Sequence, residues 1–280
     1  MLSLLRTMGL TMFALLLFVP ILVTVVNSLM PEREISANYD MLGSSNRNDF
    51  VNLKLIPDWV SFGQYFKVLV STSGYLHMFW NSVYMVVPII IGQVAVGALA
   101  AYAFAKFRFP GKELLFFLYL TAMLMPFQVT LVPNYLMVDR LGLLNSSSSI
   151  ILPGIFAAFG VFLLRQFMLQ IPTAYMEAAK IDGASYLRIF VSIVLPMVKP
   201  GIAALIVLLF ADNWNMVEQP LIFLRDAELQ PLSVFLSSLQ KEAFGVTFAA
   251  SCLYMAPMVL LFLNTEKYFI EGIQLSGIKG

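Results

Sequence analysis

Residues 8–29 read MGLTMFALLLFVPILVTVVNSL, and no charged side chain interrupts them. About 20 consecutive apolar residues are enough to cross the hydrocarbon core of a bilayer as a helix. A cleaved signal peptide is the alternative interpretation, because Arg6 precedes the apolar run. The run is longer than a typical signal core, however, and no Ala-x-Ala site follows it. We therefore expect residues 8–29 to form a retained membrane-spanning helix.

The whole chain shares this apolar character. Of its 280 residues, 60% are hydrophobic and 12% are charged, and the mean hydropathy is +0.84. Sixteen acidic and seventeen basic side chains are too few to cover the surface of a soluble protein of this size. Six crossings of about 20 residues each leave room for loops, whereas twelve would not fit. The composition predicts an all-α, polytopic membrane protein with six transmembrane helices.

Uncharged runs mark the other expected spans. They are residues 76–104, the run between Glu113 and Asp139, the run between Arg140 and Arg165, a run from Gly201 that meets Asp212 early, and residues 245–265. Two polar segments interrupt the series, one at residues 32–75 and one at about 166–200. We expect two parts: residues 1–75, with the first transmembrane helix and a long extracytoplasmic loop, and residues 76–280, with a five-helix core.

The basic residues indicate an orientation, because cytoplasmic loops of membrane proteins carry an excess of Lys and Arg. Six spans place both termini on the same side. If the N-terminus lies inside, ten of the seventeen basic residues lie inside and seven lie outside, four of these seven in one long loop. The count favours an N-in and C-in arrangement.

Several classes of function lack the residues they need. A net charge of +1 gives no reason to expect nucleic acid as a partner. One cysteine, Cys252, and one histidine, His77, provide neither a paired metal site nor a nucleophile with its base, so we expect no catalytic residues, no metal and no cofactor in this chain. The nearest fragment to a nucleotide-binding P-loop, Gly111-Lys112-Glu113, lacks the upstream glycine and the hydroxyl. A secondary transporter of a small polar solute is the remaining alternative, but a lone Asp212 and the absence of a repeat argue against it.

The polar segment near residue 180 has the signals of two short helices at a bend. Residues 174–181 favour helix, Pro172 precedes them, and Gly183 is placed as a C-terminal stop. Ser185 is suited to cap a second helix that runs towards Pro196. Such an element, with its small alanines beside Glu177, suits insertion into a groove on another protein. An amphipathic loop that rests on the membrane surface is the alternative.

Polar side chains also interrupt the fifth apolar run. On a helix, Asp212, Asn215 and Gln219 lie at i, i+3 and i+7 and therefore share one face, with Glu218 beside it and one turn from Trp214. Ionisable groups inside a membrane are costly and normally face a cavity or a partner. Donors, acceptors and an aromatic face together suit a sugar. The stripe therefore indicates the lining of a translocation path and a possible substrate contact, with cross-linking of helices or an interfacial position as alternatives.

The polar segment resembles a known motif. Glu177-Ala178-Ala179, followed by Gly183 and by Ile193-Val194-Leu195-Pro196, is similar to the EAA loop of ABC importer permeases. The sequence Ile181-Asp182-Gly183-Ala184-Ser185 narrows the resemblance to the carbohydrate-uptake family, and within it to the second permease subunit of maltose-type importers. Weaker matches extend it over most of the chain from about residue 76: residues 101–105 with 109–112, 163–167, 214–215 with 220–224, and 267–269 with 277–280.

The resemblance implies a transport subunit of the bacterial or archaeal cell membrane that is not itself an enzyme. Its members pair with a sister permease, receive a sugar from an extracytoplasmic binding protein, and bind two ATPase subunits that hold ATP and Mg²⁺. The loop at about 166–200 would be the coupling loop that docks into the ATPase and drives alternating access. By this resemblance its docking residues are Glu177, Ala178, Ala179, Lys180, Asp182 and Gly183.

Two features depart from the family pattern. The outer segment at residues 38–52 is longer than usual before Leu55-Ile56-Pro57, and contact with the binding protein, an ordered lid and a flexible insertion are the open interpretations. After Trp214-Asn215, where relatives continue with apolar residues, this chain has Met216-Val217-Glu218-Gln219.

Overall fold

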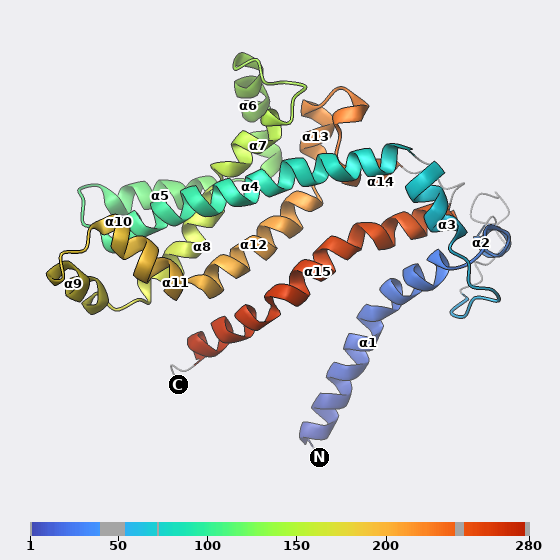
Figure 1. The fold of residues 1–280 in the computed structure, drawn as a ribbon, viewed down its shortest axis with the longest axis horizontal. Coiled ribbons are helices and arrows are strands. Elements are labelled where there is room, and N and C mark those ends of the chain that lie inside the picture. The colour runs from blue at the N-terminus through green and yellow to red at the C-terminus, as the bar shows by residue number, and fades with distance from the viewer. Residues whose placement is uncertain (1, 40–53, 72, 239–243, 278–280) are drawn as a thin grey trace. The chain divides into compact units, whose positions relative to one another are not determined.

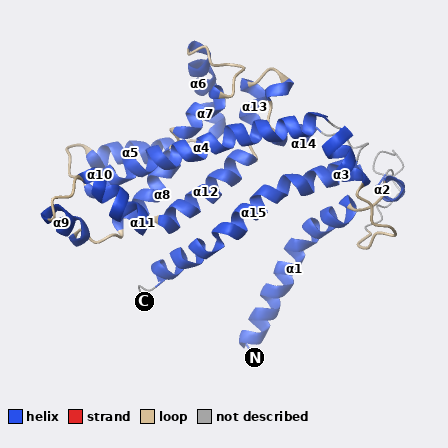
Figure 2. Ribbon diagram, in the orientation of Figure 1, coloured by secondary structure: helices blue, strands red, loops and turns tan. Residues whose placement is uncertain are grey.

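The computed structural model describes residues 2–39, 54–71, 73–238 and 244–277. Within these ranges the chain forms helices joined by short connections, and none of the described residues forms a strand (Figure 2). The all-α class is therefore confirmed for the described part of the chain. Residues 40–53, most of the long outer segment noted in the sequence, lie outside it.

Figure 1 labels the helices along the chain. The longer ones are α1 (Leu2–Ser28), α4 (Ser73–Lys106), α5 (Lys112–Met123), α6 (Phe127–Arg140), α8 (Ala158–Leu169), α12 (Lys199–Trp214) and α15 (Phe244–Gly277). The shorter ones are α2 (Glu32–Tyr39), α3 (Gly63–Phe66), α7 (Ser148–Ile155), α9 (Ala174–Ile181), α10 (Tyr186–Ile189), α11 (Leu195–Met197), α13 (Glu218–Phe223) and α14 (Leu232–Ser238). Two π-helical stretches, η2 (Lys67–Ser71) and η3 (Phe190–Val194), continue α3 and α10, and a 3₁₀ turn, η4 (Ala227–Leu229), follows α13.

The helices include four that are long and apolar enough to cross a membrane. They are Arg6–Ser28, Gly74–Lys106, Ser148–Leu169 and Phe244–Lys267. Two more spans result if each of two bent helix pairs counts as one: α5 with α6, bent by 102°, and Tyr186–Met197 with α12, bent by 74°. The described part of the chain thus contains four to six candidate spans, and the chain is a polytopic membrane protein.

Prolines account for both bends. Pro126 lies between α5 and α6, and Pro200 lies in the first turn of α12. A proline has no N–H to donate to the preceding turn, and its ring disfavours helical backbone in the residue before it. The third and fifth apolar runs are therefore pairs of helices set at an angle rather than single straight helices.

The chain divides into two compact units, which are described separately. One comprises Met1–Phe79 and Val234–Pro257, and the other comprises Trp80–Ser233 and Met258–Gly280. The functional division expected between residues 75 and 76 stays a prediction.

The first unit has a small aromatic core at the C-terminal end of α1. Tyr39 of α2 packs against Phe244 and Phe248 of α15, with ring centroids 5.7 and 5.4 Å apart. Asn27 Nδ2 donates a hydrogen bond of 2.6 Å to the Tyr39 hydroxyl, and burial raises the pKa of that hydroxyl above its usual value. None of the most apolar part of Arg6–Ser28 is buried within the chain. Most of α1 is therefore left for lipid or for another subunit.

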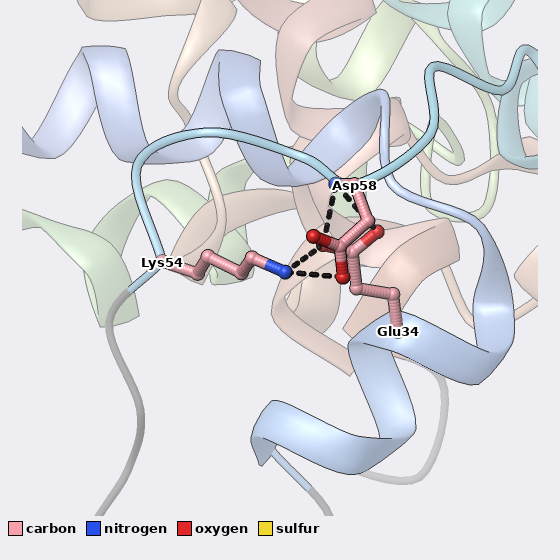
Figure 3. A network of polar contacts seen from close by, with 3 residues as sticks. All are labelled: Glu34, Lys54 and Asp58. Atoms are coloured by element: carbon pink, nitrogen blue, oxygen red, sulfur yellow. Dashed lines mark hydrogen bonds and ion pairs between the residues drawn. The ribbon is translucent and has the colours of Figure 1, made fainter.

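An ion-pair network fixes the backbone that follows α2 (Figure 3). Lys54 Nζ lies 2.9 Å from Glu34 Oε1 and 2.5 Å from Asp58 Oδ2. The Asp58 N–H donates to the Glu34 carboxylate at 3.0 Å. The hydrogen bonds to Asp58 and Glu34 raise the pKa of Lys54, so the ammonium stays charged across the physiological range. Residues 54–58 are thereby held against α2.

The second unit is built around α8, which packs on α5 and on α12 (Figure 1). Its largest buried cluster joins Ala98, Tyr102, Leu164, Phe190 and Leu205 from α4, α8, η3 and α12. The helices α4 and α8 approach closely where two glycines meet: a Cβ added to Gly97 would lie 3.3 Å from the backbone carbonyl carbon of Gly160. Small residues allow this approach, which is how helices gain packing in lipid.

Candidate functional site

The expected coupling loop has the local structure that its sequence predicts. Helix α9 covers Ala174–Ile181, and it ends where Gly183 takes a left-handed conformation with φ +77°. Two backbone hydrogen bonds close the end, from Gly183 N to Lys180 O at 3.0 Å and from Ala184 N to Ala179 O at 2.9 Å. The Ser185 hydroxyl then accepts from Arg188 N at 3.3 Å and caps α10. The helix, the glycine stop and the serine cap are all confirmed.

One side of α9 is packed into the second unit. Met176 is buried and joins the cluster that holds Leu164 and Phe190, and Ala179 packs against the same cluster. Lys106 at the end of α4 donates to the carbonyl of Ile171, just before α9, at 2.5 Å. These contacts attach the short helix firmly to the long helices.

An aromatic bridge crosses the bend. The Lys180 ammonium lies 4.5 Å from the centre of the Tyr186 ring, and that ring meets Phe107 edge-on at 5.1 Å. A hollow of about 690 Å³ lies beside this bridge and is lined by Lys106, Phe107, Arg108, Phe109, Thr173, Met176, Glu177, Lys180 and Tyr186.

The other side of α9 is exposed. Glu177, Ala178, Lys180, Asp182 and Gly183 all lie at the surface. Ile181, which the sequence argument did not select, is 88% exposed. Of the six residues expected to dock, Ala179 alone is half-buried and therefore supports the helix from within. The exposed set combines an apolar tip with charges of both signs.

The polar stripe of the fifth run is not a single helical face. Helix α12 ends at Trp214, and α13 begins at Glu218, so the expected spacing of Asp212, Asn215 and Gln219 on one helix is wrong. Asn215 ends α12 by folding its side chain back, and its Nδ2 donates to Ala211 O at 2.7 Å.

The break nevertheless brings most of these residues to one place. A hollow of about 530 Å³ is lined by Asp212 and Gln219 together with Gln93, Asn134 and Asn213, among other residues. A second hollow of about 680 Å³ shares Asp212 and Gln219 and adds Asn215 and Glu218. We call the two adjoining hollows together the polar hollow. Two carboxylates and five amides line it, and neither of the two linings includes Lys or Arg. Such a surface offers hydrogen bonds to hydroxyl groups.

Trp214 has a different position from the one expected. It is buried, and it stacks on Phe210 with ring centroids 5.0 Å apart and an interplanar angle of 16°. Its indole therefore packs within the protein and does not line either hollow.

Three amide residues of the polar hollow were missed in the sequence. Gln93 comes from α4, Asn134 from α6 and Asn213 from α12. Gln93 is buried at the break between α7 and α8, where its Nε2 lies 3.4 Å from Ala157 O. With its amide turned over, it donates to Gly154 O at 3.1 Å and accepts from Gly160 N at 3.2 Å. In the turned-over orientation the Gln93 amide bridges two backbone groups at this helix break. The one sequence signal for Gln93 was an amide residue within an otherwise apolar helix.

The described ranges also bear on metal binding. No group of three His, Cys, Asp or Glu side chains within residues 2–39, 54–71, 73–238 and 244–277 is placed to hold a metal ion.

Comparison with known proteins agrees with this architecture. The chain is 29% identical to the arabinooligosaccharides transport system permease protein AraQ of Halalkalibacterium halodurans over 282 residues, which covers 100% of this chain and 97% of the relative. It is 35% identical over 208 residues to the sn-glycerol-3-phosphate transport system permease protein UgpE of Pectobacterium atrosepticum, covering 72% of this chain and 74% of the relative.

A solved structure has the same fold. It is a bacterial ABC transporter involved in the import of the acidic polysaccharide alginate, with a TM-score of 0.78 at 23% identity, covering 95% of this chain and 96% of the matched chain. Residues 93–266 match the family described as binding-protein-dependent transport system inner membrane component. The chain belongs to this family, and it is a membrane-embedded permease subunit of a binding-protein-dependent ABC importer rather than an enzyme.

Proposed function

We propose that this permease imports a sugar or a sugar derivative, and that α9 with its bend carries the force of ATP hydrolysis from separate ATPase subunits. The observation that carries the proposal is the two-sided environment of α9. Met176 and Ala179 seat it in the core of the second unit, while Glu177, Asp182 and Ile181 are exposed. A short helix with one fixed side and one free side can move as a rigid lever.

The exposed side of α9 suits a groove on another protein. Ile181 supplies a large apolar contact at the tip, and well-packed apolar residues provide most of the energy of protein interfaces. Glu177, Lys180 and Asp182 surround it with charges that can select the partner and its orientation. Ala178 lets the partner approach the helix backbone, and Gly183 allows the turn that presents the tip.

The polar hollow beside Asp212 supports the second half of the proposal. A sugar exposes hydroxyl groups that both donate and accept hydrogen bonds, and the carboxylates and amides of the hollow match them. The residues that we place on the translocation path are Asp212, Asn215, Glu218 and Gln219, joined by Gln93, Asn134 and Asn213. Among the relatives, the one from H. halodurans belongs to an arabinooligosaccharide transport system.

The partners follow from the proposed role. A sister permease completes the path, two ATPase subunits bind the α9 tips, and an extracytoplasmic binding protein delivers the solute. The alginate transporter has also been solved with an alginate pentasaccharide-bound periplasmic protein, and its fold matches this chain with a TM-score of 0.59. We place both termini in the cytoplasm of a bacterial or archaeal cell, because that orientation puts α9 where ATP is available.

Transport into sealed liposomes tests the proposal. The chain is assembled with its partner permease, its ATPase and its binding protein, with ATP inside and labelled oligosaccharide outside. We expect uptake that requires both ATP and the binding protein. Uptake driven by an ion gradient without ATP would instead show a secondary transporter and would refute the coupling role.

A further inference from the structure

The first unit carries an exposed apolar strip that lies outside the coupling loop and the polar hollow. It consists of seven side chains between residues 55 and 70, all of them exposed: Leu55, Ile56, Trp59, Val60, Phe62, Phe66 and Val70. Trp59 is 78% exposed and Ile56 is 77% exposed. Contiguous apolar surface of this kind on a protein indicates a binding partner or a membrane.

The strip is part of an ordered amphipathic element. Phe62 at the N-cap of α3, Phe66 in α3 and Val70 in η2 are spaced four residues apart and are all exposed. Gln64 and Val68 occupy the opposite side and are 3% and 1% exposed. Large apolar side chains therefore lie on the exposed side of this element, whereas its buried side holds the polar Gln64 and the apolar Val68.

Hydrogen bonds fix the strip to the C-terminal end of α1. Ser61 N donates to Leu29 O at 2.8 Å, and the hydroxyls of Ser28 and Tyr65 share a hydrogen bond of 2.7 Å. The apolar stretch of α1, Arg6–Ser28, has 23 residues. At 1.5 Å per residue it is about 34 Å long, slightly more than the roughly 30 Å hydrocarbon core. Its last residues, and the strip attached to them, therefore lie where hydrocarbon gives way to headgroups.

The charged residues beside the strip are paired. Lys67 forms an ion pair with Glu32, and Lys54 lies between Glu34 and Asp58 (Figure 3). Pairing lowers the cost of holding charges near a medium of low dielectric constant. Tryptophan is enriched at membrane interfaces, because its apolar ring can contact lipid there while its N–H reaches water.

We propose that this apolar strip lies in the headgroup layer at the C-terminal end of α1, with Trp59 as its anchor to lipid. The strip adjoins the unburied apolar surface of α1, and its exposed tryptophan with paired charges beside it favours lipid headgroups over a protein partner. The strip fixes the level of the first unit in the membrane.

Depth measurement with spin labels tests the proposal in the complete transporter in liposomes. Cys252→Ala removes the native thiol, partners without cysteine are used, and a nitroxide is attached to Val60→Cys, so that Trp59 stays in place. A label at Leu15→Cys, an exposed position in the middle of α1, provides the hydrocarbon reference, and a free water-soluble nitroxide outside the liposomes provides the water reference. The ratio of collisions with oxygen to collisions with a polar nickel complex reports the depth.

We expect the ratio at position 60 to lie between the two references. A ratio equal to that of the free nitroxide in water would place the strip in water and overturn the proposal. A label shielded from both reagents would show that a protein covers the strip, and it would overturn the proposal as well. Trp59→Asp should shift the ratio at position 60 towards the water reference, whereas Trp59→Phe should leave it unchanged. The ratio with Trp59 intact decides the matter even if Trp59→Asp does not fold.

Discussion

The ammonium of Lys180 lies 4.5 Å above the ring of Tyr186, on the other side of the bend at Gly183. An exposed cation–π pair of this kind contributes about 0.5–1 kcal/mol. The contact joins the end of α9 to the start of α10 and, through Phe107, to the end of α4. The loop is therefore braced from both sides of its turn, as a force-transmitting element requires.

The bend itself can be tested by substitution at Gly183. Its φ of +77° is costly for any other residue, roughly 1–2 kcal/mol, whereas a Cβ there would touch nothing within 4 Å. Gly183→Val should therefore leave the protein inserted but relax the turn, and it should lower the amount of solute imported per ATP hydrolysed. Gly142→Val is the matched control, because Gly142 also has a positive φ of +66° and open space around it. If the two variants import the same amount of solute per ATP hydrolysed, the bend at Gly183 has no role in coupling.

The structural role of the buried side of α9 can be tested separately from the binding role of its exposed end. Met176 is 8% exposed, and its replacement by alanine should cost about 2–5 kcal/mol through the cavity left behind. Met176→Ala should therefore lower the thermal unfolding midpoint of the purified permease. Ile181→Ala should leave that midpoint unchanged and weaken binding of the ATPase, because Ile181 touches little within the chain. If Ile181→Ala destabilises the permease alone, its side chain is structural.

The polar hollow predicts a transport defect at Asp212. Asp212→Ala should reduce solute uptake strongly while the amount of inserted protein stays near that of the unchanged chain, because the carboxylate is exposed and lines both hollows. Asp139→Asn provides the control, since Asp139 is also exposed but lines neither hollow. Uptake and protein level are measured in the same cells. Loss of protein in parallel with uptake would assign Asp212 to folding instead.

The orientation predicts which thiols a membrane-impermeant reagent can reach. In a Cys252→Ala background, Arg33→Cys should be labelled from outside intact cells, and Asp182→Cys should be labelled only after the cells are opened. Both positions are exposed in the chain, so in cells that express the permease without its ATPase the access of the reagent depends on the side of the membrane. Labelling of Asp182→Cys in intact cells would reverse the N-in and C-in arrangement.

The local features of the loop could be predicted from the sequence to the residue. Pro172, Gly183 and Ser185 act within one turn of the backbone they control, so the bounds of α9 did not depend on the rest of the fold. The apolar runs likewise marked the four spans that are not sharply bent, although one of them, Ser148–Leu169, continues past Arg165, where the uncharged run ends.

The breaks and the polar hollow could not be predicted in this way. No charged residue lies between Glu113 and Asp139, so the 102° bend between α5 and α6 at Pro126 leaves the uncharged run unbroken. Asp212 and Gln219 come together through a helix end at Trp214, not through helical spacing. Gln93 and Asn134 join them from helices far away in the sequence, and only tertiary packing could show that they line the same hollow.

Photo-crosslinking from position 181 tests the coupling role of α9 most directly. A photoreactive amino acid replaces Ile181 in the assembled transporter, and a second transporter carries it at Arg33 as the control. After illumination we expect the label at position 181 to join the permease to the ATPase subunit and to stop ATP-driven uptake, while the label at position 33 does neither. Crosslinks from position 181 to lipid alone, or unchanged uptake after crosslinking to the ATPase, would contradict the account.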